Sequence, residues 1–136
     1  MPAPSDAHTI SVTIPRPPGE VYAYVTDPRN LPAWAAGLAT SVERRDGRWV
    51  VDSGEGEWTV EFVPENDLGV ADHLVTLPDG RQQLNPMRVL PNGDGSEVTF
   101  TIFRAEIGDD HDEWAHLIAT IRDDLLALRT ALAAAP

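Results

Sequence analysis

The sequence predicts an α+β domain in which a curved antiparallel sheet of seven strands holds a long C-terminal helix. Three features support this prediction. A strand and two short helical segments open the chain, short runs separated by tight-turn signals fill its middle, and one apolar stripe at helical spacing closes it. The long helix needs an apolar partner, and one face of the sheet is the only large apolar surface available. A twisted sheet of this size would curl around the helix.

The length of 136 residues fits one domain, and a chain of this size can bury a sizeable core. Residues 1–8 are polar and contain proline, so we expect them to form a disordered N-terminal tail. Residues 9–134 are then the single folded domain.

The composition excludes several classes of function. The formal net charge of −12 argues against nucleic-acid binding, which needs clustered cations. With no cysteine, the chain has no disulfide, thiolate metal site or cysteine nucleophile. The N-terminus lacks the apolar core of a signal peptide, and no apolar run approaches the roughly 18 residues of a membrane span. A cytoplasmic location is the expectation.

Near the N-terminus, polar and apolar residues alternate over 9–14, which predicts a half-buried strand. The proline-rich segment 15–19 ends this strand. A short helix is expected over 20–26, where apolar residues fall at helical spacing. Asp27 closes this helix, because a residue that precedes proline avoids the helical region. A second short helix is expected over 30–36.

The middle of the chain changes to short runs that alternate with turn signals. Pairs such as Asp46-Gly47 and Asn92-Gly93 favour tight hairpins, because glycine accepts a positive φ without steric cost. The sequence therefore predicts an antiparallel meander. Its strands are expected at 40–45, 48–52, 57–63, 69–77, 81–90 and 96–106.

The C-terminal segment predicts a helix of about five to six turns, because its apolar residues form one stripe. The stripe consists of Trp114, Leu117, Ile118, Ile121, Leu125, Leu128 and Leu132. The opposite face is expected to hold Arg122, Asp123, Asp124 and Arg129. Asp110 and Glu113 have the spacing of a capping box, and Asp109 and Asp112 favour the positive end of the helix dipole.

Strand faces suggest which side chains reach the space between sheet and helix. Trp58 and Phe62 alternate with polar neighbours, so they are expected to point inward. On the last strand, Phe100 and Arg104 share one face, which we also take as the inner one. Arg104 could hold a carboxylate or enolate at the mouth of a cavity, or form a salt bridge with Glu106.

His73 lies in a strand whose two faces both carry apolar residues. If residues 78–80 form a tight turn, Leu77 pairs with Arg81 and His73 lies opposite Asn85. An inward His73 would give the pocket polar groups and a possible general base. A histidine on the surface, or hydrogen-bonded in a structural role, is the alternative.

The sequence predicts neither a metal site nor a cofactor. His111 and His116 are five residues apart, whereas two ligands on one helical face stand three or four apart. The Gly54 and Gly56 pair lies between strands and not before a helix, so it is not a phosphate loop. The chain also lacks the Gly-x-Ser-x-Gly nucleophile elbow.

Three segments carry a family resemblance: ISVTIPRPPGEVY (10–22), DPRNLPAW (27–34) and GSEVTF (95–100). With the order of elements, they resemble the START-like superfamily, also called SRPBCC, and within it the polyketide cyclase/dehydrase-type group. The resemblance spans residues 10–132. It implies the helix-grip fold, an internal cavity, and positions for Trp34 and Trp114 at the cavity mouth. Its motifs are specific for the fold and weak for function, since the superfamily contains lipid and hormone carriers, cyclases and co-chaperone-like domains.

These expectations favour binding of a small hydrophobic or aromatic, lipid- or polyketide-like molecule by a monomer or homodimer. One alternative is a cyclase or dehydratase that uses His73 or Arg104. The other is an interaction domain with an apolar patch around Leu74 and Leu84. The expected ligand-binding residues are Trp34, Trp58, Phe62, His73, Asn85, Phe100, Arg104, Trp114, Leu117 and Ile118.

Overall fold

The computed structural model describes residues 3–36, 38–54, 56–104 and 110–133. Within them the chain is α+β, with a curved antiparallel arrangement of strands and a long C-terminal helix, as predicted. The elements are, in order, β1 (Ala7–Ile14), α1 (Pro18–Val25), η1 (Pro28–Asn30), α2 (Leu31–Trp34), β2 (Ser41–Arg45), β3 (Arg48–Asp52), β4 (Glu57–Phe62), β5 (His73–Thr76), β6 (Gln82–Asn85), β7 (Met87–Asn92), β8 (Gly95–Phe103) and α3 (His111–Ala133).

The strands form two sheets, one with the order β1-β8-β7 and one with the order β2-β3-β4-β5-β6. The prediction of a single strand over 81–90 was therefore wrong. Pro86 has no N–H to donate to a ladder, and it divides this run into β6 and β7, which belong to different sheets. The described residues thus contain eight strands, not seven.

Other boundaries also differ from expectation; β8, for example, ends at Phe103 and not at residue 106. Strand β1 begins at Ala7 and not at residue 9, because Ala7 and His8 pair with Phe103 and Ile102 of the long strand β8. Backbone hydrogen bonds can pair two strands without alternating apolar side chains. The sequence pattern therefore did not show that Ala7 and His8 belong to β1. The strand expected over 69–77 is shorter in the structure, where β5 covers only His73–Thr76. The residues before it pair with β7 at one isolated β-bridge, between Val70 and Arg88.

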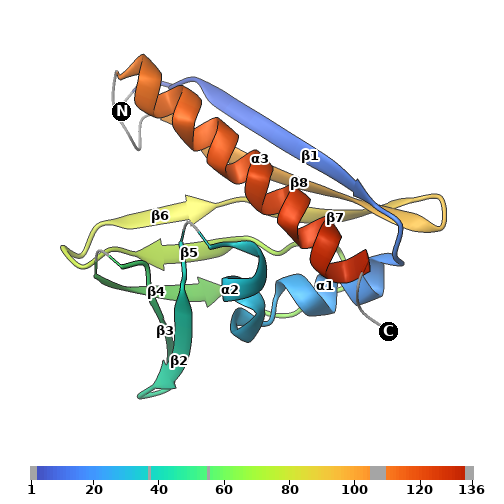
Figure 1. Cartoon of the computed structure of the whole chain (residues 1–136), viewed down its shortest axis with the longest axis horizontal. Helices are drawn as coiled ribbons and strands as arrows, with labels where there is room; N and C mark the ends of the chain where they lie inside the picture. Colours follow the sequence, from blue (N-terminus) through green and yellow to red (C-terminus); the bar gives the residue numbers. More distant parts are fainter. Residues whose placement is uncertain (1–2, 37, 55, 105–109, 134–136) are drawn as a thin grey trace.

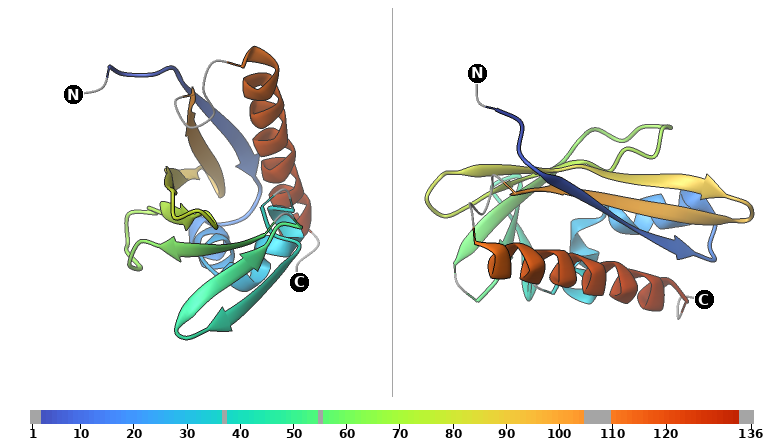
Figure 2. Two further views of the ribbon diagram at one scale, coloured as in Figure 1. Left: turned by 90° about the vertical axis from the view of Figure 1, so that its left-hand side faces the viewer. Right: turned by 90° about the horizontal axis from the view of Figure 1, so that it is seen from above.

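Helix α3 lies along β1, and the N-terminal helices α1 and α2 lie near its C-terminal half (Figures 1 and 2). The Asp110 half of the predicted capping box is confirmed: its carboxylate accepts from the backbone N–H groups of Asp112 (2.9 Å) and Glu113 (3.1 Å). Asp109 lies outside the described residues. Leu125, Leu128 and Leu132 of the stripe are buried, and they join one hydrophobic core with β1, β8 and α1.

In the described part of the chain, no helix combines the length and the apolar character needed to cross a membrane.

Candidate functional site

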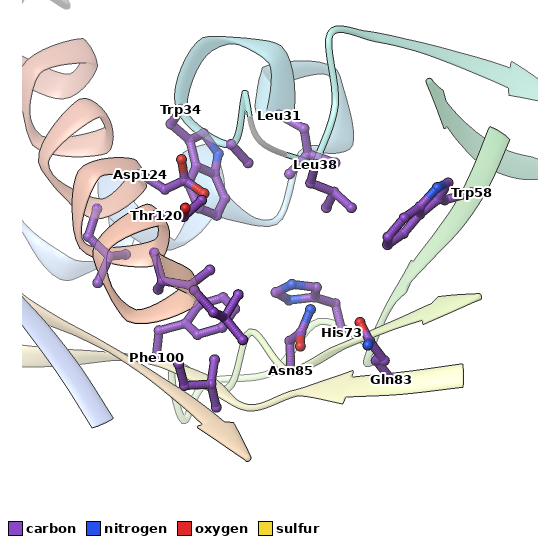
Figure 3. A pocket seen from close by; sticks show the side chains of 15 residues that line it. Leu31, Trp34, Leu38, Trp58, His73, Gln83, Asn85, Phe100, Thr120 and Asp124 are labelled. Carbon is purple, nitrogen blue, oxygen red and sulfur yellow. The ribbon is translucent and has the colours of Figure 1, made fainter. Parts of the chain in front are cut away.

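A pocket of about 240 Å³ lies between α2, α3 and the inner faces of both sheets (Figure 3). Most of its wall is apolar, and five polar side chains interrupt it. The apolar lining consists of Leu31, Trp34, Ala35, Leu38, Trp58, Phe100, Ile102, Leu117, Ile121 and Leu125. The polar lining consists of His73, Gln83, Asn85, Thr120 and Asp124.

His73 points into this pocket and is 2% exposed. Its Nδ1–H donates to the Ala71 carbonyl oxygen at 3.1 Å, so in the neutral ring Nε2 keeps its lone pair. The ring packs against Phe62, with centroids 4.8 Å apart, and against Phe100, at 5.9 Å. Desolvation by burial lowers the pKa of His73 below its ordinary value, which favours the neutral base.

His73 and its partner Asn85 both lie on the inner face of the sheet, where they line the pocket. The expected turn is confirmed: Leu77 N–H donates to Arg81 O, and His73 lies opposite Asn85. On the other face, the Asp72 carboxylate accepts from the backbone N–H of Met87 (2.8 Å) and from Arg88 Nη2 (3.0 Å). These hydrogen bonds hold the Asp72 side chain in place. It ties β5 to β7 and fixes the direction of its neighbour His73.

Trp34 forms another wall of the pocket, at the end of α2. The turn that carries it is held by Asp27, whose carboxylate accepts from Arg29 N–H (3.0 Å), and by Asn30, whose side-chain amide donates to Tyr24 O (3.0 Å). The Trp34 side chain is 3% exposed. Its Nε1–H is buried and has no hydrogen-bond partner among the described residues.

Helix α3 contributes Asp124 to the pocket, which corrects the expectation that this residue lies on the outer face. The lining residues of α3 are Leu117, Thr120, Ile121, Asp124 and Leu125. Their spacing of 3, 1, 3 and 1 marks one helical face. Burial, and secondly the charge of Asp123, raise the pKa of Asp124 to about 7.

The pocket brings together several of the residues expected from the sequence: Trp34, Trp58, His73, Asn85, Phe100 and Leu117. The remaining ones lie elsewhere. Phe62 supports the ring of His73 from outside the lining. Trp114 and Ile118 pack against the hydrophobic core, because their positions on α3 turn them away from the pocket.

Arg104 also lies outside the lining, just past the end of β8. Its Nη2 donates to His111 Nδ1 at 2.8 Å, and its Nη1 lies 3.7 Å from Asp6 Oδ2. This side chain therefore joins the N-terminal segment to the start of α3. The suggested partner Glu106 lies outside the described residues.

Several lining residues were not among those expected: Leu31, Ala35, Leu38, Gln83, Ile102, Thr120, Ile121, Asp124 and Leu125. A pattern in the sequence could have found some of them. Gln83 shares a face with Asn85 by strand alternation, and Thr120 lies one turn before Asp124 on the face of Leu117. Leu31, Ala35 and Leu38 carry no such pattern, since α2 is a single short turn.

On the outer face of the sheet, Leu74 and Leu84 pair across β5 and β6, and Leu84 is 50% exposed. The next strand places the exposed Glu61 opposite Leu74. A charged residue therefore borders this leucine pair. Among the described residues, no three His, Asp or Glu side chains lie together as a metal site would require.

Comparison with known proteins agrees with the fold. A family model described as "Polyketide cyclase / dehydrase and lipid transport" matches residues 7–133. Among curated proteins, none matches the sequence.

Solved structures resemble this chain at low sequence identity. DynU16, from the dynemicin biosynthetic locus, has a TM-score of 0.70 and 22% identity, over 96% of this chain and 48% of DynU16. The chain thus spans about half the length of that protein. Ara h 8.0201 has a TM-score of 0.64 and 13% identity, over 96% of this chain and 100% of its own. TTHA0849 from Thermus thermophilus has a TM-score of 0.65 and 20% identity, with the same coverage. At these identities, the likeness concerns the fold alone.

Proposed function

Because this chain belongs to the polyketide cyclase / dehydrase and lipid transport family, we propose that it binds a small hydrophobic or aromatic molecule in the pocket between α3 and the sheets. The observation that supports this most directly is the lining itself. Aromatic and aliphatic side chains surround the space, and a few polar groups interrupt them, which is the usual composition of a small-molecule site.

The size of the pocket limits the ligand. An engineered apolar cavity of about 150 Å³ holds benzene. The volume of about 240 Å³ here suits a molecule with one or two rings. A larger polycyclic molecule or a long acyl chain would have to extend beyond the pocket.

We expect Thr120→Phe to weaken binding of one- and two-ring aromatic compounds at least tenfold, because the added ring fills the space that the ligand needs. Isothermal titration calorimetry with toluene, acetophenone, naphthalene and octanoate measures this. The matched control is Ala119→Phe, which adds the same ring at an exposed position of α3. If the wild-type chain binds none of the compounds, or if both variants weaken binding equally, the proposal is wrong.

A second candidate function is proton transfer to or from the bound molecule, and the inward position of His73 favours it. The neutral imidazole presents the Nε2 lone pair in a water-poor pocket, as a general base requires. Such a base removes an α-proton from a bound ketone to give the enolate, and a solvent deuteron can then return to that carbon.

We therefore expect the wild-type chain to accelerate hydrogen–deuterium exchange at the methyl group of acetophenone in D₂O, and His73→Asn to lose at least a hundredfold of that rate. Asparagine keeps a donor near the position of Nδ1, so the bond to Ala71 can persist. Proton NMR follows the exchange. Equal rates with the two proteins at saturating acetophenone would show that His73 is structural.

A further inference from the structure

The pocket has an unsatisfied donor on one of its walls. Trp34 Nε1–H is buried, on a side chain that is 3% exposed, and it meets no acceptor in the described part of the chain. Buried N–H groups in folded proteins are nearly always hydrogen-bonded, because an unpaired one loses its bonds to water without replacement. Trp34 lines the pocket, so a turn of its ring toward the pocket's contents would give this N–H an acceptor.

The neighbours of this donor are polar as well. Figure 3 shows Trp34, Thr120 and Asp124 on one side of the pocket, while His73, Gln83 and Asn85 lie on another. Thr120 and Asp124 are four residues apart on α3 and so stand one above the other. Leu31, Leu38 and Phe100 lie among the apolar lining of the same pocket.

From this geometry we propose that Trp34 is a specificity-determining residue: its indole N–H, beside Thr120 and Asp124, binds a carbonyl-type acceptor oxygen on an otherwise apolar, one- or two-ring ligand. The inference rests on the proposed function, because it names the polar group of the molecule that the same pocket takes. It predicts a preference for aromatic ketones over hydrocarbons of the same shape.

The protonation state of Asp124 is consistent with an acceptor at this place. Its raised pKa of about 7 means that in slightly acidic solution the carboxyl group is largely protonated. A protonated carboxyl group can donate a second hydrogen bond to the same oxygen. An ionised carboxylate would instead compete with the ligand oxygen for the indole N–H.

The test compares acetophenone with 2-phenylpropene, in which a methylene group replaces the carbonyl oxygen at nearly the same shape. Affinities of the full chain for both compounds are measured by calorimetry at pH 6. We expect Trp34→Phe, which keeps an aromatic ring and removes the N–H, to lower the ratio of ketone to hydrocarbon affinity about tenfold. Affinity for 2-phenylpropene should change less than about threefold.

Trp49→Phe is the matched control, because Trp49 is an indole of β3 that lies outside the pocket lining. This variant should keep the wild-type ratio. If both compounds bind and the ratio is the same in Trp34→Phe as in the wild type, the inference is wrong while the proposed function stands. If neither compound binds the wild-type chain, the proposed function fails and this inference with it.

A second measurement needs no variant. The chain contains four tryptophans, so the ¹H–¹⁵N spectrum shows their indole N–H signals separately from the backbone. Saturation with acetophenone should move the Trp34 indole proton downfield, as a new hydrogen bond does, and 2-phenylpropene should not. Equal movement with both compounds would contradict a bond to the carbonyl oxygen.

Discussion

Replacing Gly69 with alanine is expected to lower the free energy of unfolding by about 4 kcal/mol. Gly69 has a φ of +73°, and a Cβ built on it would lie far inside van der Waals contact with the carbonyl oxygen of Val89. The same two residues share a backbone hydrogen bond, from Val89 N–H to Gly69 O at 2.8 Å. An alanine therefore has to push β7 away and strain the bond that holds it.

Urea denaturation of the two proteins measures this loss. Gly80→Ala is the matched control: Gly80 has a φ of +90°, and nothing lies within 4 Å of the position of its Cβ. We expect this variant to lose only about 1 kcal/mol, from the left-handed backbone conformation alone. Equal losses in the two variants would show that the approach of Gly69 to β7 is unimportant for stability.

Gly69 also affects the pocket. The segment that follows it runs beside β7 and then continues into β5. Val70 bridges to Arg88, Asp72 binds Arg88 and the backbone of Met87, and His73 then enters β5 facing inward. A displaced Gly69 would move the strand that carries the buried imidazole. Ligand affinity in Gly69→Ala is a second way to detect the displacement.

The sequence predicted the register of β5 and β6 through its turn chemistry, but it left open which face of β5 points inward. Residues 78–80 have the composition of a tight turn, and a turn fixes which residues of two strands lie opposite each other. From that, the pairing of His73 with Asn85 follows, and the structure confirms it. Local rules sufficed here because the register of a hairpin is a local property.

Other features depend on contacts between distant segments, so sequence patterns predicted them incorrectly or not at all. Asp124 has the pattern of a polar, exposed residue, and only the packing of α2 against α3 encloses it. Arg104 follows the inward alternation of β8, but the strand ends at Phe103 and the side chain turns to His111 instead. Strand alternation predicts the direction of a side chain only within the strand, and Arg104 lies one residue beyond its end.

The pocket contains two ionisable groups whose pKa values burial shifts in opposite directions. Burial lowers the pKa of His73 from its ordinary 6.5 and raises that of Asp124 from 3.8 to about 7. Between pH 6.5 and about 7, His73 is therefore mostly neutral, and Asp124 is still at least half protonated. An apolar ligand meets the least charge in this range, so we place its tightest binding there.

We expect Asp124→Asn to be more stable than the wild type at pH 8 by about 1 to 2 kcal/mol, a value that allows for solvent screening at this partly exposed side chain. In the unfolded chain Asp124 ionises near pH 3.8, whereas in the folded chain it keeps its proton up to about pH 7. Between these values the folded state holds more protons, so wild-type stability falls as the pH rises. Asparagine has the same shape and does not titrate.

Urea denaturation of both proteins at pH 4, 6 and 8 measures the difference in their free energies of unfolding. The contribution of His73 titration is the same in both proteins and drops out of that difference. The advantage of Asp124→Asn should be small at pH 4 and grow with pH. Asp123→Asn, at the exposed neighbouring position, should differ from the wild type by less than about 0.5 kcal/mol at every pH. A difference between Asp124→Asn and the wild type that does not change with pH would mean that Asp124 ionises as it does in water. The carboxyl group would then be open to solvent, and the wall of the pocket beside Trp34 would not be enclosed.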